Sequence, residues 1–252
     1  MSEKTVDIGL YSYVNNTPIL MIDKYGKYAV TVHYQMTYKA LLKLGYSRKE
    51  ADIIAHYSST YSDHPTNSVL HADVTLHGNT TMRQVGYRPT IDYRRTVNSQ
   101  GEENSMWHSM MSDEEAKNGM TEREAMQRGL EFGWNNVFEY ATSKEKKDLG
   151  KLGQGLHALQ DAIAHEGVKT NDHLGKNWSS AKKLANDMYG GTYEASNLTR
   201  SALIVNEVLQ GNTSNLRNGD KLDVRGMSKE QFNQFMQVLL QYGFKGTLKD
   251  EQ

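Results

Sequence analysis

Residues 149–166 read LGKLGQGLHALQDAIAHE. Leucine and isoleucine recur there at three- and four-residue spacing, which predicts an amphipathic helix with its apolar stripe against a core. His157, Asp161 and His165 follow one another every four residues, so on a helix they drift by only about 80° and project from one face. Small residues that would let another segment approach flank the His157 side: Gly150, Gly153 and Ala164. We therefore expect a central helix with one apolar and one polar edge.

Four capping boxes mark the starts of other helices, because a Ser or Thr followed three residues later by Glu or Gln satisfies two backbone N–H groups reciprocally. They are Ser47 with Glu50, Ser112 with Glu115, Thr121 with Glu124, and Ser228 with Gln231. Together with the apolar spacing, they predict helices over 29–44, 48–61, 113–118, 122–142, 145–166, 179–189, 193–210 and 229–242. Glycines lie at or just past many of the helix ends, as helix C-termini prefer: Gly45, Gly119, Gly167, Gly190, Gly211 and Gly243. We expect an all-α fold, a multi-helix bundle around the polar edge of the central helix.

Two regions depart from the helical pattern. Residues 1–26 are rich in Tyr and Asn and are typical of a short strand-and-turn extension. Between about 64 and 106 the helical period vanishes, and an alternation around Gly78-Asn79 permits a hairpin, with one long irregular loop as an equal alternative. The chain thus divides into an extension over 1–26 and a helical domain over 27–252.

Composition excludes several classes of protein. The 252 residues carry 29 Lys+Arg and 30 Asp+Glu, a net charge of −1, which excludes a generally basic surface of the kind that holds duplex nucleic acid. There is no cysteine, so disulfides, thiolate metal sites and cysteine nucleophiles are excluded together. No run of about 18 apolar residues and no secretory signal is visible, so we expect no transmembrane segment and no signal peptide.

The polar edge of the central helix offers the ligands of a metal site. His157, Asp161 and His165 would supply nitrogen and oxygen atoms of the kind that Zn²⁺ takes. Taken alone, a histidine and an aspartate four residues apart are more often a solvated ion pair. Four further candidates lie elsewhere, each of which alone would more often be a core, surface or turn residue: His33, Asp63, His108 and His173.

Residues 10–26 read LYSYVNNTPILMIDKYG. This stretch resembles the last segment of rearrangement-hotspot (Rhs) repeat proteins, a Leu-Tyr-x-Tyr-Val-x-Asn-Asn-Pro run that ends in Asp-Pro-x-Gly. Lys24 stands where that family usually has proline. The resemblance implies that the following domain is an antibacterial toxin, secreted or delivered into target cells by a specialised secretion system. It also implies an Rhs shell and a cognate immunity protein as partners.

The order of the candidate ligands resembles the all-helical superfamily of zinc-dependent phospholipases C and single-strand-specific zinc nucleases. The most specific piece is residues 156–165, LHALQDAIAH, and the match extends by scattered motifs over residues 30–178. The resemblance implies that Asp63, His108, His157 and Asp161 hold one zinc, and that His33 and Asp161 help to hold a second. His165 and His173 would belong to the third ion of that family.

Three departures from the family pattern bear on the number of metals. The family's N-terminal amine ligates zinc, whereas here residues 1–26 precede the first ligand. The spacing from Asp161 to His165 is shorter than in the best-known members, and Asn177 stands where an acidic ligand is usual. We therefore expect one or two well-occupied zinc ions rather than three.

The resemblance implies a zinc-dependent phosphoester hydrolase, in which we expect Asp63 to orient or deprotonate the attacking water. An apolar lip around residues 106–111 would favour phospholipase C-like hydrolysis at a phospholipid membrane surface, although a methionine cluster is more often part of a core. Arginines and tyrosines between residues 83 and 95 would instead suit a single-stranded nucleic acid. A non-catalytic interaction module with a decayed metal site is a third alternative.

Overall fold

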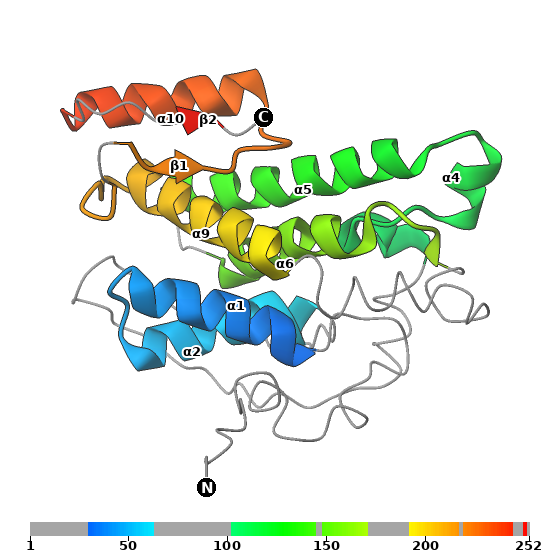
Figure 1. The fold of residues 1–252 in the computed structure, drawn as a ribbon, viewed down its shortest axis with the longest axis horizontal. Coiled ribbons are helices and arrows are strands. Elements are labelled where there is room, and N and C mark those ends of the chain that lie inside the picture. The colour runs from blue at the N-terminus through cyan, green and yellow to red at the C-terminus, as the bar shows by residue number, and fades with distance from the viewer. Residues whose placement is uncertain are drawn as a thin grey trace, which may run out of the picture.

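The computed structural model describes residues 30–62, 102–144, 148–170, 192–216, 219–243 and 249–250. Within these ranges the chain is mainly helical, so the predicted all-α class is confirmed (Figure 1). The helices are α1 (Val30–Lys43), α2 (Arg48–His56), η2 (Tyr57–Tyr61), η3 (Glu102–His108), α4 (Asp113–Lys117), α5 (Glu122–Thr142), α6 (Leu149–His165), α9 (Thr192–Leu209) and α10 (Lys229–Gln241). Two-residue strands, β1 (Lys221–Leu222) and β2 (Lys249–Asp250), pair in parallel.

The four capping boxes place the starts of their helices correctly. All four predicted capping boxes are present, with both reciprocal hydrogen bonds, at Ser47, Ser112, Thr121 and Ser228. Each satisfies backbone N–H groups that have no partner within the helix, so it fixes where the helix begins. The predicted segment 1–26, the helix 179–189 and most of the irregular stretch 64–106 lie outside the described residues.

Three predicted boundaries are wrong in detail. The helix expected over 145–166 begins at Leu149, after its N-cap Asp148. The helix expected over 48–61 is α-helical only to His56 and continues as the π-helix η2. The end of the stretch expected to be irregular, residues 102–106, belongs to the 3₁₀-helix η3. Both irregular helices contact α6, and both help to build the site described below.

Helix α6 lies at the centre, between α5 and α9, with α1 and α2 on one side and α10 on the other (Figure 1). Glycines bring α5 and α6 close together: a Cβ atom at Gly133 would lie 3.0 Å from the Gly155 carbonyl oxygen, and one at Gly155 would lie 2.8 Å from the Gly133 carbonyl oxygen. The apolar stripe predicted for α6 is buried in the main core, together with Trp134 of α5 and Leu198 of α9. The polar edge of α6 is therefore held on a rigid, closely packed helix.

Helix α6 also packs closely against η2. A Cβ atom at Gly153 would lie 2.5 Å from the Tyr57 carbonyl carbon, so only glycine admits the η2 backbone at this distance. Of the three small residues predicted to let another segment approach, Gly153 is the one at which the structure shows this. Among the described helices, none is both long and apolar enough to cross a membrane.

Candidate metal centre

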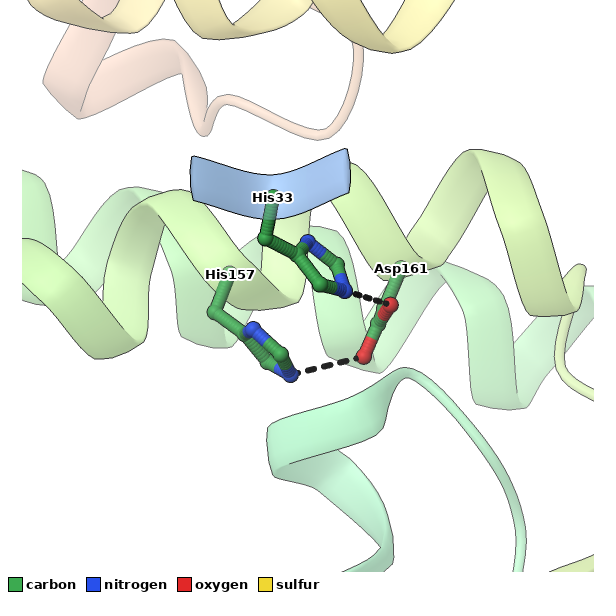
Figure 2. Close-up of side chains that lie close together, drawn as sticks. All are labelled: His33, His157 and Asp161. Atoms are coloured by element: carbon green, nitrogen blue, oxygen red, sulfur yellow. Dashed lines mark ion pairs between the residues drawn. The ribbon is translucent and has the colours of Figure 1, made fainter. Parts of the chain in front are cut away.

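The carboxylate of Asp161 on α6 is the centre of a buried histidine cluster. His33 Nε2, from α1, lies 3.2 Å from Asp161 Oδ1, and His157 Nε2, one turn earlier on α6, lies 3.0 Å from Oδ2 (Figure 2). The side chains of all three residues are 1% exposed. The ring nitrogens of His33 and His157, which are 124 positions apart in the sequence, thus contact the same carboxylate.

His108 and His165 complete the cluster. His108, the last residue of η3, has its Nδ1 atom 3.1 Å from Asp161 Oδ2 and 3.1 Å from His157 Nε2. His165 Nδ1 lies 3.8 Å from Asp161 Oδ2, and His165 is also buried. Four histidines from three segments therefore surround a single carboxylate.

The chain around His108 is tightly constrained. Ser109 has a φ of 50°, in the left-handed region that a serine rarely adopts, and its hydroxyl donates to the Ala158 carbonyl oxygen of α6 at 2.7 Å. Met111 then pairs with the segment after α6, donating to Val168 O at 3.1 Å and accepting from Thr170 N at 3.0 Å. This unusual backbone is held by contacts on both sides, which is common beside functional residues.

Hydrogen bonds at the Nδ1 atoms fix the protonation and the orientation of two of the rings. His157 Nδ1 lies 3.1 Å from the Ser58 carbonyl oxygen of η2, and His165 Nδ1 lies 2.7 Å from the His108 carbonyl oxygen. Because a carbonyl oxygen only accepts, both Nδ1 atoms carry a proton. In the neutral form of His157 the Nε2 lone pair therefore points at Asp161.

The electrostatics of the cluster favour a negative Asp161. Burial by itself raises the pKa of this carboxyl, but His165, His157 and His33, with a hydrogen bond from His108, outweigh it and hold the pKa well below its usual range. Burial lowers the pKa of His165, more than the neighbouring Asp161 raises it. The site therefore presents an ionised carboxylate and at least one neutral imidazole.

This arrangement could hold a metal ion. Ligand atoms of His33, His157 and Asp161 all lie within 4.8 Å of one another. Asp161 Oδ1 accepts no well-aligned hydrogen bond although it is buried and close to His33. A carboxylate facing imidazole lone pairs is repelled by them unless a cation, either protons or a metal ion, lies between, so the donor set fits a metal.

Five of the seven predicted site residues are brought together: His33, His108, His157, Asp161 and His165. Asp63, predicted both as a ligand and as the catalytic group, and His173 lie outside the described residues. The predicted apolar lip is partly wrong, because Met110 and Met111 are only 1% and 4% exposed. Both methionines directly follow Ser109, whose φ of 50° turns the chain.

Two contributions to the site carried no sequence signal of their own. The Ser58 carbonyl depends on the π-helical geometry of η2, and Gln160 was recognised only as part of a motif. Gln160 accepts from His33 Nδ1 at 2.6 Å and is fully buried. The sequence signal for Gln160 was its position as a polar residue next to Asp161 on the same helix.

Arg128 of α5 donates hydrogen bonds to η3 and to the residues just after it. It therefore helps to position His108, the last residue of η3, and this role can be tested by mutation. Its guanidinium pairs with Glu115 and donates to the Met110 carbonyl oxygen at 2.7 Å and to Ser105 Oγ at 3.2 Å. Burial by itself raises the pKa of Glu115, but hydrogen bonds from Arg128 and Ser112 outweigh it and lower the pKa from 4.5. The pair therefore contributes stability above about pH 4.5 that is lost as the pH falls through the lower pKa of the folded state.

We expect Arg128→Ala to lower the free energy of unfolding by about 2 kcal/mol at pH 7, since charge-assisted hydrogen bonds are lost. The loss should narrow at a pH below 4.5, as Glu115 begins to be protonated in the wild type too. Urea denaturation at both pH values measures the difference. Lys151→Ala, which removes an exposed ion pair with Glu139, is the matched control and should change stability by under about 1 kcal/mol. An equal cost of Arg128→Ala at both pH values would contradict the assignment.

Comparison of the chain with protein-family models, with curated proteins and with solved structures finds no match. What the protein does must therefore be argued from the residues of the cluster and from the sequence resemblances.

Proposed function

We propose that the domain is a zinc-dependent phosphodiesterase, with phospholipid as the substrate, that acts as a toxin delivered into target cells. The single observation that carries the proposal is the convergence of α1, η3 and α6 on Asp161. These segments supply His33, His108 and His157 in the order in which the zinc phospholipase C and nuclease superfamily supplies its ligands. The Rhs-like residues 10–26 support delivery, an Rhs shell and an immunity protein as partners.

The distances support zinc as the metal. At a zinc–ligand bond of about 2.0–2.1 Å, the edges of a tetrahedron of ligand atoms are about 3.3 Å long. His157 Nε2 and His108 Nδ1 lie 3.0 and 3.1 Å from Asp161 Oδ2 and 3.1 Å from each other, close to three such edges. His33 Nε2 lies 3.2 Å from the other carboxylate oxygen, Oδ1. Nitrogen ligands combined with one carboxylate also suit zinc better than magnesium or calcium, which prefer oxygen. We propose one or two ions, with Asp63 as a further ligand and His173 at a third position.

When bound, zinc supplies a Lewis acid that activates water near neutral pH and stabilises the negative charge on a phosphoryl group. The protein's own part is to hold the ligands in place. Ser58 O and His108 O fix the rings of His157 and His165. The rigid contact of α6 with α5 and η2 keeps Asp161 and His157 at a constant spacing. We propose that Asp63 orients or deprotonates the attacking water.

The residues in front of His108 support phospholipid as the substrate. Met106 and Trp107 are half-buried and immediately precede His108 at the end of η3. With Met110 and Met111 buried, these two residues are what remains of the predicted apolar lip. Single-stranded nucleic acid is the alternative substrate, and the arginines that would support it lie outside the described residues.

A non-catalytic role for the cluster is supported by its burial. His33, His108, His157 and Asp161 are each 1% exposed, as in structural metal sites, whose ligands are closed to solvent. In that case the metal would stabilise an interaction module rather than catalyse a reaction. The two proposals differ in whether the metal-loaded protein turns over a phosphodiester.

The proposed function is tested with protein purified without chelators. Elemental analysis should find about one or two zinc ions per chain. The protein should release phosphocholine from phosphatidylcholine vesicles, and a chelator should abolish the release. Cleavage of single-stranded DNA in place of lipid would move the assignment to a nuclease, and bound zinc without either reaction would favour the interaction module.

His157→Ala should abolish hydrolysis and toxicity while leaving a helical circular-dichroism spectrum. His56→Ala is the matched control, because His56 is a partly exposed histidine on α2 outside the cluster. Full activity of His157→Ala, or absence of zinc from the wild type, would rule out the proposed site.

A further inference from the structure

Gln160 is the residue before Asp161 on α6, and its side chain is completely buried. It joins three helices: it lies 2.6 Å from His33 Nδ1 of α1, 3.0 Å from Thr37 Oγ1 of α1 and 3.0 Å from Thr199 Oγ1 of α9. Gln160 does not reach the centre of the cluster itself. It meets the ring of His33 on the side opposite to Asp161.

The contact with Thr199 fixes which way the Gln160 amide points. The Thr199 hydroxyl donates its proton to the Ala195 carbonyl oxygen at 2.6 Å, so it can only accept from Gln160. The atom of Gln160 that faces Thr199 must then be the NH₂ group, and the oxygen faces His33. A carboxamide oxygen only accepts, so His33 Nδ1 must donate to it.

We propose that Gln160 is a positioning residue that holds His33 in the tautomer with its proton on Nδ1 and its Nε2 lone pair toward Asp161. Reversing the amide would place its oxygen against the Thr199 oxygen and its NH₂ against His33. The hydrogen bond to Thr199 of α9 therefore selects the tautomer in which His33 of α1 faces the metal site. This inference rests on the proposed metal site for its purpose, but the tautomer itself can be measured without metal.

His33 differs in this respect from His157 and His165. Their Nδ1 protons are accepted by backbone carbonyls, of Ser58 and His108, which no side-chain substitution removes. The Nδ1 proton of His33 is accepted by a side chain, so its tautomer can be changed by mutation. Partners of this kind commonly affect metal affinity by about 10–100-fold.

The tautomer is measured by nitrogen-15 NMR of histidine side chains in metal-free protein, with His33 assigned by comparison with His33→Asn. In the wild type, His33 Nδ1 should carry a proton, whether the metal-free ring is neutral or is also protonated on Nε2 beside Asp161. In Gln160→Met, which keeps the shape and removes the acceptor, the proton should redistribute between the two ring nitrogens. Zinc titration of the same samples should show a dissociation constant raised by about 10-fold or more. Gln154→Met, a half-buried glutamine on the same helix, is the matched control and should change neither quantity.

A wild-type His33 whose Nδ1 carries no proton would overturn the inference, and this measurement needs no variant. An unchanged tautomer and zinc affinity in Gln160→Met would overturn it as well. If Gln160→Met does not fold, Thr199→Val removes the anchor of the amide and should weaken zinc binding to a smaller extent, with wild-type affinity as the contrary result. If the wild type binds no zinc, the proposed function fails while the tautomer result still decides the role of Gln160.

Discussion

Replacing Asp161 with asparagine should remove bound metal while leaving the helical bundle folded. The substitution keeps the size of the side chain but removes the charge that His33, His108 and His157 surround. An amide oxygen is a weak zinc ligand, and the contacts of residue 161 with the three histidines all change at once. We expect zinc affinity to fall by about 100-fold or more and hydrolysis to fall to background. Elemental analysis and calorimetric titration with zinc measure the first effect, and the vesicle assay measures the second.

Asp223→Asn is the matched control for this prediction. Asp223 is another buried aspartate, 4% exposed, and its carboxylate pairs with Arg225 away from the histidine cluster. Because Arg225 is 38% exposed, breaking this pair should lower the free energy of unfolding by only about 1 kcal/mol, and it should leave the zinc content unchanged. Zinc binding at wild-type affinity by Asp161→Asn, or equal loss of zinc from both variants, would contradict a site centred on Asp161.

Local signals predicted the helices but not their irregular ends. A capping box acts within four residues, so Ser112 with Glu115 could be recognised from the sequence alone. The change from α2 to the π-helix η2 depends on packing against Gly153, which lies almost a hundred residues further along the chain. The burial of Met110 and Met111 likewise depends on the left-handed turn at Ser109 and its bond to α6.

The candidate site was predictable in two different ways. Spacing on one helix placed His157, Asp161 and His165 on a common edge. No periodicity relates His33 or His108 to that edge, because each comes from another segment of the chain. They could be proposed only from the order of motifs in a known superfamily, and the structure places both on Asp161.

The part played by Gln160 could not be predicted, because it depends on a hydroxyl group 39 residues away on α9. A glutamine beside an aspartate on a helix is compatible with a surface position as well as with a buried one. Only the packing of α1, α6 and α9 around it shows that its amide has a single orientation. Residues that orient ligands are thus harder to recognise from one sequence than the ligands themselves.

Gly153→Ala should disturb both the stability and the metal site, because it separates α6 from η2. The new Cβ would lie 2.5 Å from the Tyr57 carbonyl carbon and 2.7 Å from Tyr57 Cβ, distances that require the backbone to move. Tyr57 is itself 1% exposed and cannot swing aside. We expect the free energy of unfolding to fall by about 3 kcal/mol, as in other overpacked cores. Urea denaturation measures this loss.

The effect of Gly153→Ala on zinc follows from the residue next to Tyr57. Displacing η2 moves the Ser58 carbonyl, which accepts from His157 Nδ1 at 3.1 Å and so holds the ring toward Asp161. We expect zinc affinity to fall by about 10-fold or more in the fraction that remains folded. Gln154→Ala, on the next residue of α6, is the control and should leave both quantities near wild type. Intrinsic helix propensity alone would make Gly153→Ala stabilising by about 1 kcal/mol, so a stabilised variant would show that η2 does not pack against α6 at this distance.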